Sequence, residues 1–368
     1  MSLLQFDISK CVRTTNKASS CTLCQECCPT KAITITQQIP SFIPSECIGC
    51  DGCNAICPNE AFFLDDFDSI NAIFSFLEQQ QTLLSCKENI PCLAAFSVEE
   101  LISLALLIPQ EQLRLNKSYC DECSIKEPNC SLIEQRVQEA NFILKAIQSK
   151  KVILFEEFLE EKRPKEEDRR AFLSKLSPKE AIKLKQKFEN EVEATNEELT
   201  TQTASLEDIK AIREQKEVPK RRKLLLMALK EHKPDIYHTI SSEDITFSSM
   251  KIIDDSCDNC QMCYRICPTQ ALSASIKYDT IFFEAYKCIK CESCHDVCEK
   301  NAIVLHNVFD LKAFFQPQKQ TLKRFSMRRC DECNLVYVDD GNPLCKRCRI
   351  EEEEAMNLWG IDPKMRSF

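Results

Sequence analysis

Cysteines recur in this chain at a spacing that few folds can accommodate. Three stretches share the pattern C-x2-C-x2-C-x3-C: "CIGCDGCNAICPNEAFFL" from Cys47, "CDNCQMCYRICPTQALSA" from Cys257 and "CIKCESCHDVCEKNAIVL" from Cys288. A short strand-like run follows the fourth cysteine of each stretch. Repetition of this kind indicates one structural unit that occurs several times along the chain.

A fourth copy with altered spacing lies near the N-terminus. Its end, "CCPTKAITI", matches "CPTQALSA", which makes Cys28 the fourth cysteine, Cys24 the third and Cys21 the second. Because "FDISKC" resembles the "FEAYKC" of the last copy, Cys11 is the expected first cysteine, and a nine-residue spacer follows it where the other copies have two residues. Cys27 is then spare, and the sequence leaves open whether Cys11 or Cys27 completes the set.

This spacing is typical of cysteines that bind [4Fe-4S] clusters in pairs. Three cysteines bind one cluster, and the fourth ligates the other cluster of the pair. A proline after the fourth cysteine favours an extended backbone at that position. The rule predicts four ligand groups: Cys11, Cys21, Cys24 and Cys57 (first N-terminal group); Cys28, Cys47, Cys50 and Cys53 (second N-terminal group); Cys257, Cys260, Cys263 and Cys298 (first C-terminal group); Cys267, Cys288, Cys291 and Cys294 (second C-terminal group).

Both segments resemble bacterial dicluster ferredoxin domains, over about residues 1–66 and 250–310. The resemblance implies two ferredoxin-like modules with four [4Fe-4S] clusters. The departures are the long spacer after Cys11 and Glu299 in place of the usual proline. Zinc knuckles built from the same cysteines are the alternative, although structural zinc does not exchange a ligand between sites. "CESCH", which ends at His295, matches a haem-attachment pattern, but its cysteines already belong to a cluster motif, so we expect no haem.

Strand-like and helix-like runs alternate between the two modules. "TLLSC", "EQLRLN" and "KVILF" read as strands, and the residues Val98–Leu107 and Ile133–Gln148 read as helices. Strands that alternate with helices predict a small parallel sheet. We call this segment, residues 71–155, the middle lobe.

Five cysteines fall in the middle lobe, several of them just after predicted strands. The carboxyl ends of parallel strands are where α/β folds bind ligands. We therefore expect a fifth iron-sulfur cluster or a metal site there, formed by the middle group: Cys86, Cys92, Cys120 and Cys123. The alternatives are a redox dithiol in "CDEC" (Cys120 and Cys123), or buried thiols, to which Cys130 would add one more.

Two further segments follow. From residue 156 to 240 the chain is rich in Glu, Lys and Arg with apolar residues at helical spacing, which predicts a charged helical linker packed on one face, or a partner-docking arm. "CDECNLVYVDDGNPLCKRC" resembles a zinc ribbon, with rubredoxin-type iron as the alternative, and an acidic helix follows it. Its ligands would be the ribbon group: Cys330, Cys333, Cys345 and Cys348.

The fold prediction is an α+β chain in five parts. Two dicluster modules (residues 1–70 and 241–315) flank the small α/β middle lobe (71–155) and the helical linker (156–240), and a zinc-ribbon-like segment with an acidic tail (316–368) ends the chain.

The amino-acid composition argues against several classes of function. A net charge of −9 argues against nucleic-acid binding and suits docking to basic patches on redox partners. The four glycines cannot form the usual NAD, FAD or ATP cradles. "LISLALLIP" is too short to span a membrane. Many cysteines in C-x2-C runs, without a secretory signal at the start, indicate a reducing, cytoplasmic environment.

These features predict an electron carrier or redox subunit. The expected partner is a redox enzyme such as a formate dehydrogenase, hydrogenase or reductase, because the order of modules is similar to multi-cluster ferredoxins associated with bacterial molybdenum formate dehydrogenases. An accessory protein for the maturation or regulation of such an oxidoreductase is the alternative. An enzyme acting at the middle cysteines is a third option, which would need an open coordination position or a reactive thiolate.

Overall fold

Two antiparallel strand pairs frame the N-terminal cysteines in the computed structural model, which describes residues 4–156, 178–196, 216–234 and 238–359. We call residues 4–64 the N-terminal module. Its elements are β1 (Leu4–Phe6), α1 (Val12–Thr15), α2 (Leu23–Glu26), β2 (Ile33–Thr36), β3 (Ile39–Phe42), η1 (Pro44–Glu46), α3 (Gly52–Ile56) and β4 (Phe62–Leu64). β1 pairs with β4 and β2 with β3. A small core of aliphatic and aromatic side chains from these strands packs against the cysteines.

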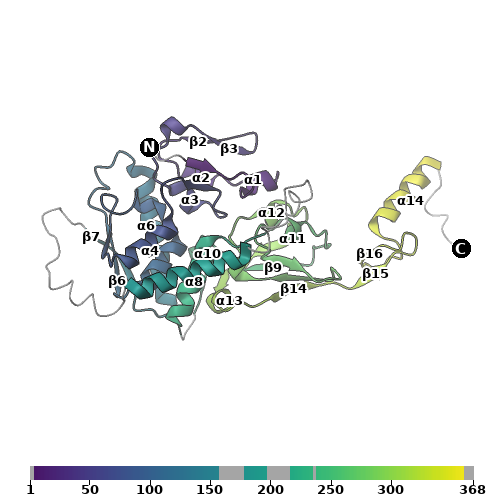
Figure 1. The fold of residues 1–368 in the computed structure, drawn as a ribbon. Coiled ribbons are helices and arrows are strands. Elements are labelled where there is room, and N and C mark those ends of the chain that lie inside the picture. Colours follow the sequence, from purple (N-terminus) through teal and green to yellow (C-terminus); the bar gives the residue numbers. More distant parts are fainter. Residues whose placement is uncertain (1–3, 157–177, 197–215, 235–237, 360–368) are drawn as a thin grey trace.

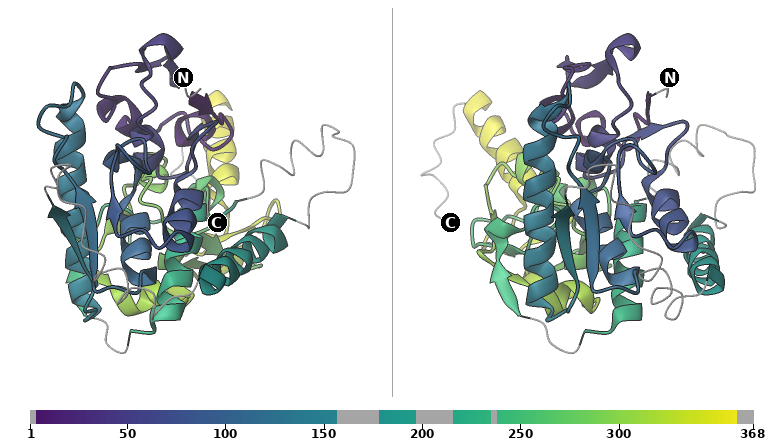
Figure 2. Two further views of the ribbon diagram at one scale, coloured as in Figure 1. Left: turned by 60° about the vertical axis from the view of Figure 1, so that its left-hand side comes forward. Right: turned by 90° about the vertical axis from the view of Figure 1, so that its left-hand side faces the viewer.

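The middle lobe contains the predicted parallel sheet. Its elements are α4 (Ser69–Glu78), β5 (Leu83–Leu84), η2 (Leu93–Ala95), α5 (Val98–Leu107), β6 (Gln112–Asn116), α6 (Lys126–Ala146) and β7 (Val152–Glu156). β6 is the central strand and pairs in parallel with both β5 and β7, which confirms the alternation predicted from sequence. The right-hand view of Figure 2 shows α6 lying alongside these strands.

Helix α5 lies at the centre of the core because most of its residues are apolar and the two glutamates of its first turn have polar partners. All ten of its residues are buried. It begins with a capping box, in which Ser97 Oγ accepts a hydrogen bond from the Glu100 N–H (3.3 Å) and the Glu100 carboxylate accepts one from the Ser97 N–H (2.8 Å). Helices α4, α6 and α10 pack around it, so the predicted linker contributes to the core of the middle lobe.

Within the predicted linker, the structure describes α8 (Pro178–Asn196) and α10 (Lys220–His232); residues 157–177 and 197–215 lie outside the described residues. Helix α10 packs against the middle lobe, and the sequence did not predict the burial of its charged start. Its apolar residues are buried against α5, and Arg221 and Arg222 at its start are buried too. Both arginines are buried because acidic side chains and carbonyl groups of the other segments surround them.

The C-terminal half repeats the strand-pair design. We call residues 251–305 the C-terminal module. The elements from β8 onward are β8 (Thr239–Ser241), η4 (Ser242–Asp244), β9 (Lys251–Ile253), α11 (Met262–Ile266), β10 (Leu272–Ala274), β11 (Thr280–Phe283), η5 (Ala285–Lys287), α12 (Ser293–Asp296), β12 (Ile303–Leu305), β13 (Val308–Asp310), α13 (Leu311–Phe315) and β14 (Gln320–Arg324). β9 pairs with β12 and β10 with β11, while β14 extends the second pair.

The last elements stand apart from the rest of the molecule. β15 (Met327–Arg329), β16 (Val336–Val338) and the helix α14 (Lys346–Trp359) extend away from the body at the C-terminal end (Figure 1). Within the residues that the structure describes, no helix has the length and apolar character needed to cross a membrane.

Candidate metal centres

The N- and C-terminal modules enter their first cysteine motif through the same turn. In the N-terminal module, the Ser9 N–H and hydroxyl both donate to Asp7 Oδ1, at 3.0 and 2.6 Å. In the C-terminal module, the Ser256 N–H and hydroxyl donate to Asp254 Oδ1 at 2.8 and 2.5 Å. The first cysteine of each module comes just after this turn, Cys11 two residues after Ser9 and Cys257 directly after Ser256, so Cys11 has the place in its module that Cys257 has in the other.

The sulfur atoms at corresponding positions make corresponding hydrogen bonds. Cys57 Sγ and Cys298 Sγ each accept a backbone N–H, from Ala61 and Ala302 respectively, at 3.3 Å. In the two "CPT" stretches, the sulfur lies 3.6 or 3.8 Å from the hydroxyl of the threonine two residues later. Hydrogen bonds to sulfur are one of the means by which a protein sets the potential of an iron-sulfur cluster.

Members of the first N-terminal group lie within electrostatic range of one another. Burial raises the pKa of Cys24, and the nearby charges of Cys57, Cys21, Cys27 and Cys11 raise it further. Four thiolates cannot share this space without a counter-charge, because each raises the cost of ionising its neighbours. A multivalent cationic centre would supply that charge, since metal binding deprotonates the thiols it captures.

The spare cysteine, Cys27, faces a different space. It lines a cavity together with the second N-terminal group and apolar side chains of β1, β2 and β4. Its thiol donates to the Cys24 carbonyl oxygen at 3.4 Å. Burial raises the pKa of Cys27 to about 12, although the charge of Arg136 opposes this. The charge of Cys11, in contrast, raises the pKa of Cys21, which burial raises by more.

In the C-terminal module the two predicted groups lie next to each other. Burial raises the pKa of Cys263 to about 12, and the charges of Cys294, Cys257 and Cys260 add to the effect. Cys291 lies close enough to Cys267 for that thiolate to raise its pKa, after the larger effect of burial. For Cys298 the structure gives the hydrogen bond from Ala302 and partial burial against the core.

One cysteine of this module, Cys288, lies near the positive charge of a lysine. Burial raises the pKa of Cys288, but the charge of Lys251 and a hydrogen bond from the Ser249 hydroxyl (3.4 Å) outweigh it, so the net shift is downward. Lys251 Nζ also lies 2.9 Å from Nε2 of His295, the histidine of the "CESCH" stretch. His295 therefore contacts a lysine beside the second C-terminal group.

The ribbon group has the geometry of a site for a single ion. Its four sulfur atoms lie within 4.8 Å of one another, and it is the one set of at least three metal-binding side chains gathered that closely within the described residues. Four thiolates about 2.3 Å from one tetrahedral ion would lie about 3.8 Å apart. The sulfur atoms of Cys333 and Cys345 are 3.7 Å apart. Backbone N–H groups, above all that of Cys333, lower the pKa of Cys330 to about 6, which favours the thiolate that a metal needs.

The ribbon has almost no core besides these sulfurs. Its buried side chains are Cys330, Cys345 and Cys348, against which Tyr337 and Leu344 pack. So small an apolar cluster cannot offset the chain entropy of folding. A metal ion bound by the ribbon group would supply the stabilisation that this core lacks.

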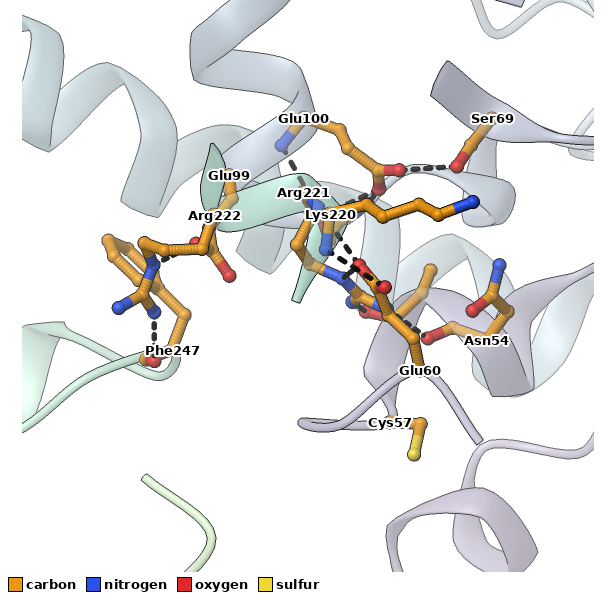
Figure 3. Close-up of polar contacts among 12 residues, drawn as sticks. Asn54, Cys57, Glu60, Ser69, Glu99, Glu100, Lys220, Arg221, Arg222 and Phe247 are labelled. Atoms are coloured by element: carbon orange, nitrogen blue, oxygen red, sulfur yellow. Dashed lines mark hydrogen bonds and ion pairs between the residues drawn. The ribbon is translucent and has the colours of Figure 1, made fainter. Parts of the chain in front are cut away.

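Sequence reasoning missed a pair of buried arginines that connects three parts of the chain (Figure 3). Arg221 reaches the N-terminal module: it forms an ion pair with Glu60 (3.0 Å) and donates to the carbonyl oxygens of Ala55 (2.7 Å) and Asn54 (2.8 Å) in α3. Burial raises the pKa of Glu60, but the charge and hydrogen bonds of Arg221 lower it below its ordinary value.

Arg222 reaches the C-terminal half from the same helix start. It is fully buried and forms an ion pair with Glu99 of α5. Its guanidinium donates to the carbonyl oxygens of Tyr286 (2.6 Å), Cys288 (2.9 Å) and Phe247 (2.9 Å). In the sequence, "KRRK" gives no indication of burial, because a charge run of this kind is usually solvated.

The nine-residue spacer after Cys11 lies against the C-terminal module. Asn16 is buried, and its side-chain amide donates to the carbonyl oxygen of Ser293 in α12, at 3.4 Å. At the same contact, a hydrogen bond from Ser20 lowers the pKa of Asp296, although burial raises it by more. The insertion thus brings the first N-terminal group next to the helix that carries Cys294 of the second C-terminal group.

Comparison with known proteins identifies part of the chain. Residues 256–303 match the family model of the 4Fe-4S dicluster domain, which supports at least one 4Fe-4S cluster site in this segment. All eight cysteines assigned to the C-terminal groups, from Cys257 to Cys298, lie within the matched residues. No curated protein and no solved structure matches the chain.

Proposed function

We propose that this protein is a multi-cluster electron carrier with two dicluster modules, and that it passes single electrons to or from an oxidoreductase. The observation that carries the proposal is the repetition of the C-terminal module's strand pairs, entry turn and sulfur hydrogen bonds in the N-terminal module. When bound, [4Fe-4S] clusters supply one-electron redox chemistry. The protein's own contribution is to hold, bury and hydrogen-bond the sulfur atoms.

In this proposal each of the four predicted groups holds one cluster. Cys11 rather than Cys27 belongs to the first N-terminal group, because it follows the turn that corresponds to the one before Cys257. Cys27 is then a structural thiol that donates to the Cys24 carbonyl oxygen. The contact between Asn16 and Ser293 holds the two modules side by side, which favours electron exchange between them.

The ribbon group is proposed to hold zinc. Four cysteine thiolates around one ion, in a segment without another core, are typical of structural zinc. The partner is proposed to be a redox enzyme such as a formate dehydrogenase, hydrogenase or reductase, approached through electrostatic complementarity with this acidic chain.

The test is the metal content of the full chain, purified without oxygen. We expect at least about sixteen irons with matching acid-labile sulfide, four per cluster, and one zinc. Cys24→Ala and Cys263→Ala should each lower the iron content and remove a dithionite-reduced EPR signal. Cys27→Ala is the matched control from the same stretch and should retain the iron of wild type.

Two results would refute the proposal. One is a protein with zinc in place of most of the iron after anaerobic purification. The other is iron that resists redox cycling by dithionite and a one-electron acceptor. If the clusters cycle normally while a Cys123→Ala variant still prevents maturation of a partner enzyme, the role is that of an accessory protein instead.

A further inference from the structure

The parallel sheet brings two cysteine-bearing loops of the middle lobe together. Cys86 follows β5, and Cys120 and Cys123 follow β6, at the same edge of the sheet. The Asn116 side-chain amide donates to the Ser85 hydroxyl (3.5 Å) from one loop to the other. These contacts fix the spacing between the loops before any metal is bound.

Cys92 completes this arrangement from a third segment. It caps η2, where its sulfur accepts the Ala94 N–H at 3.4 Å. Burial raises the pKa of Cys92 to about 12, and the charges of Cys50, Cys86 and Cys123 add to this. Burial likewise raises the pKa of Cys120 to about 12, with contributions from Cys130, Cys92 and Cys86. The four cysteines of the middle group thus lie within range of one another's charge, beside the sheet edge where β5 and β6 end.

We propose that the middle group, Cys86, Cys92, Cys120 and Cys123, holds a fifth [4Fe-4S] cluster beside the second N-terminal group. This inference rests on the proposed function. A single ion would draw four sulfurs to within about 4 Å of one another. Among the described residues only the ribbon group is drawn together so closely; neither the middle group nor the four ferredoxin-type groups is. A cube, whose four thiolates bind four separate irons, needs no such close approach of the sulfurs.

Asn129 of α6 lies between the middle group and the second N-terminal group. Its amide Nδ2 is 4.0 Å from Cys92 Sγ, and its side chain also hydrogen-bonds Cys50, which partly offsets the rise in the pKa of Cys50 caused by burial. Gly52 of α3 lies at the same contact: a Cβ there would make ordinary van der Waals contacts, 3.7 Å from Cys50 Sγ and 3.8 Å from both Asn129 Oδ1 and Ala94 Cβ. The two cysteine groups are thus separated by little more than one amide side chain.

A buried cation lies beside the same boundary. Arg136 of α6 donates to the carbonyl oxygens of Ala94 (2.7 Å) and Phe96 (2.9 Å), and no carboxylate of a described residue forms an ion pair with it. Its Nη2 is buried without a hydrogen-bond partner among the described residues. The sulfurs of Cys27 and Cys92 are among the negative groups that act on it. Because a buried charge is costly unless it is compensated, anionic thiolate-bound clusters on both sides would account for this arginine.

The five groups then form a continuous series. It runs from the C-terminal module through the contact between Asn16 and Ser293 into the N-terminal module, and through Asn129 into the middle lobe. One electron leaves a reduced cluster and enters its oxidised neighbour at each transfer, so no further reactant is needed. The middle lobe is an end of this series and a place where a partner could take up or deliver the electron.

The experiment compares iron and sulfide contents of the full chain and two variants, together with EPR of the reduced forms. Cys123→Ala is the main variant, because Cys123 is exposed and its replacement leaves the core intact. Cys130→Ala is the matched control, a neighbouring thiol outside the proposed ligand set. We expect about twenty irons in wild type and in Cys130→Ala, and a loss of iron together with one EPR signal in Cys123→Ala.

About sixteen irons in both wild type and Cys123→Ala would overturn the fifth cluster and leave the proposed function standing. A second zinc that is lost from Cys123→Ala without loss of iron would overturn the assignment as a cluster. A wild-type iron content far below sixteen, unchanged by Cys24→Ala and Cys263→Ala, would overturn the proposed function itself.

Discussion

Replacing Arg222 with methionine should destabilise the junction of three segments. The arginine is fully buried, it forms an ion pair with Glu99, and it donates to three backbone carbonyl groups. Its guanidinium also lies over the rings of Phe247 and Phe314, with the central carbon 5.4 and 4.8 Å from their centroids. Methionine has a similar length and keeps the apolar packing, so the variant isolates the loss of charge and hydrogen bonds.

The expected loss of stability comes from the groups that the substitution leaves without a partner. Glu99 would be a buried carboxylate without its partner, and breaking a buried ion pair in this way costs about 3–5 kcal/mol of the free energy of unfolding. Carbonyl groups left without a donor add to this loss. A control, Arg347→Met, removes an exposed ion pair with Glu351 on α14 and should leave the free energy of unfolding close to that of wild type.

The loss of stability caused by Arg222→Met should depend on pH. Burial already raises the pKa of Glu99, although Arg222 lowers it, and removal of the arginine raises it further. When the pKa of an acid is higher in the folded state than in the unfolded state, the acid does not destabilise the fold at a pH below its unfolded pKa, about 4.3. As the pH rises through its folded-state pKa, the free energy of unfolding falls. The variant should therefore lose more stability at pH 8 than at pH 6. Adding Glu99→Gln should restore part of the stability and remove this difference.

The assay is urea unfolding of the anaerobic protein at both pH values, followed by far-UV circular dichroism and by cluster absorbance. Cluster loss makes unfolding irreversible, so midpoints are compared between variants under one protocol. A midpoint for Arg222→Met equal to that of Arg347→Met would refute the reasoning. A lower midpoint for the double variant with Glu99→Gln than for Arg222→Met alone would refute it as well.

Three further predictions concern other parts of the chain. Cys330→Ser should remove one zinc and expose the ribbon to hydrogen exchange while the iron content stays constant; an exchange pattern identical to wild type would contradict metal-dependent folding. Ser97→Ala removes the cap of α5 and should lower the free energy of unfolding by about 1–2 kcal/mol in urea titrations; no change would mean that packing alone fixes the helix start. Asn16→Ala should weaken the contact with Ser293 by about 1 kcal/mol, visible as faster hydrogen exchange around that residue; protection equal to wild type would exclude the spacer as a docking element.

The sequence alone determined the local features. Cysteine spacing identified the dicluster motif in residues 256–303, because three of the four ligands assigned to each cluster there lie within a few residues of one another and leave a regular spacing. Alternating patterns predicted the parallel sheet of the middle lobe, since side-chain burial repeats with the period of each element. The ribbon group was equally visible, because its two cysteine pairs are close in the chain.

Only the tertiary structure decided how these parts meet. The burial of Arg221 and Arg222 depends on carboxylates and carbonyl groups from three distant segments, and nothing within "KRRK" distinguishes such residues from solvated ones. The spacer after Cys11 looked like a defect in the motif until the fold placed Asn16 against Ser293, 277 residues away. Asn129 and Gly52 lie between two cysteine groups for the same reason: contacts between segments are set by shape and charge in three dimensions, which leave no periodic trace in a single chain.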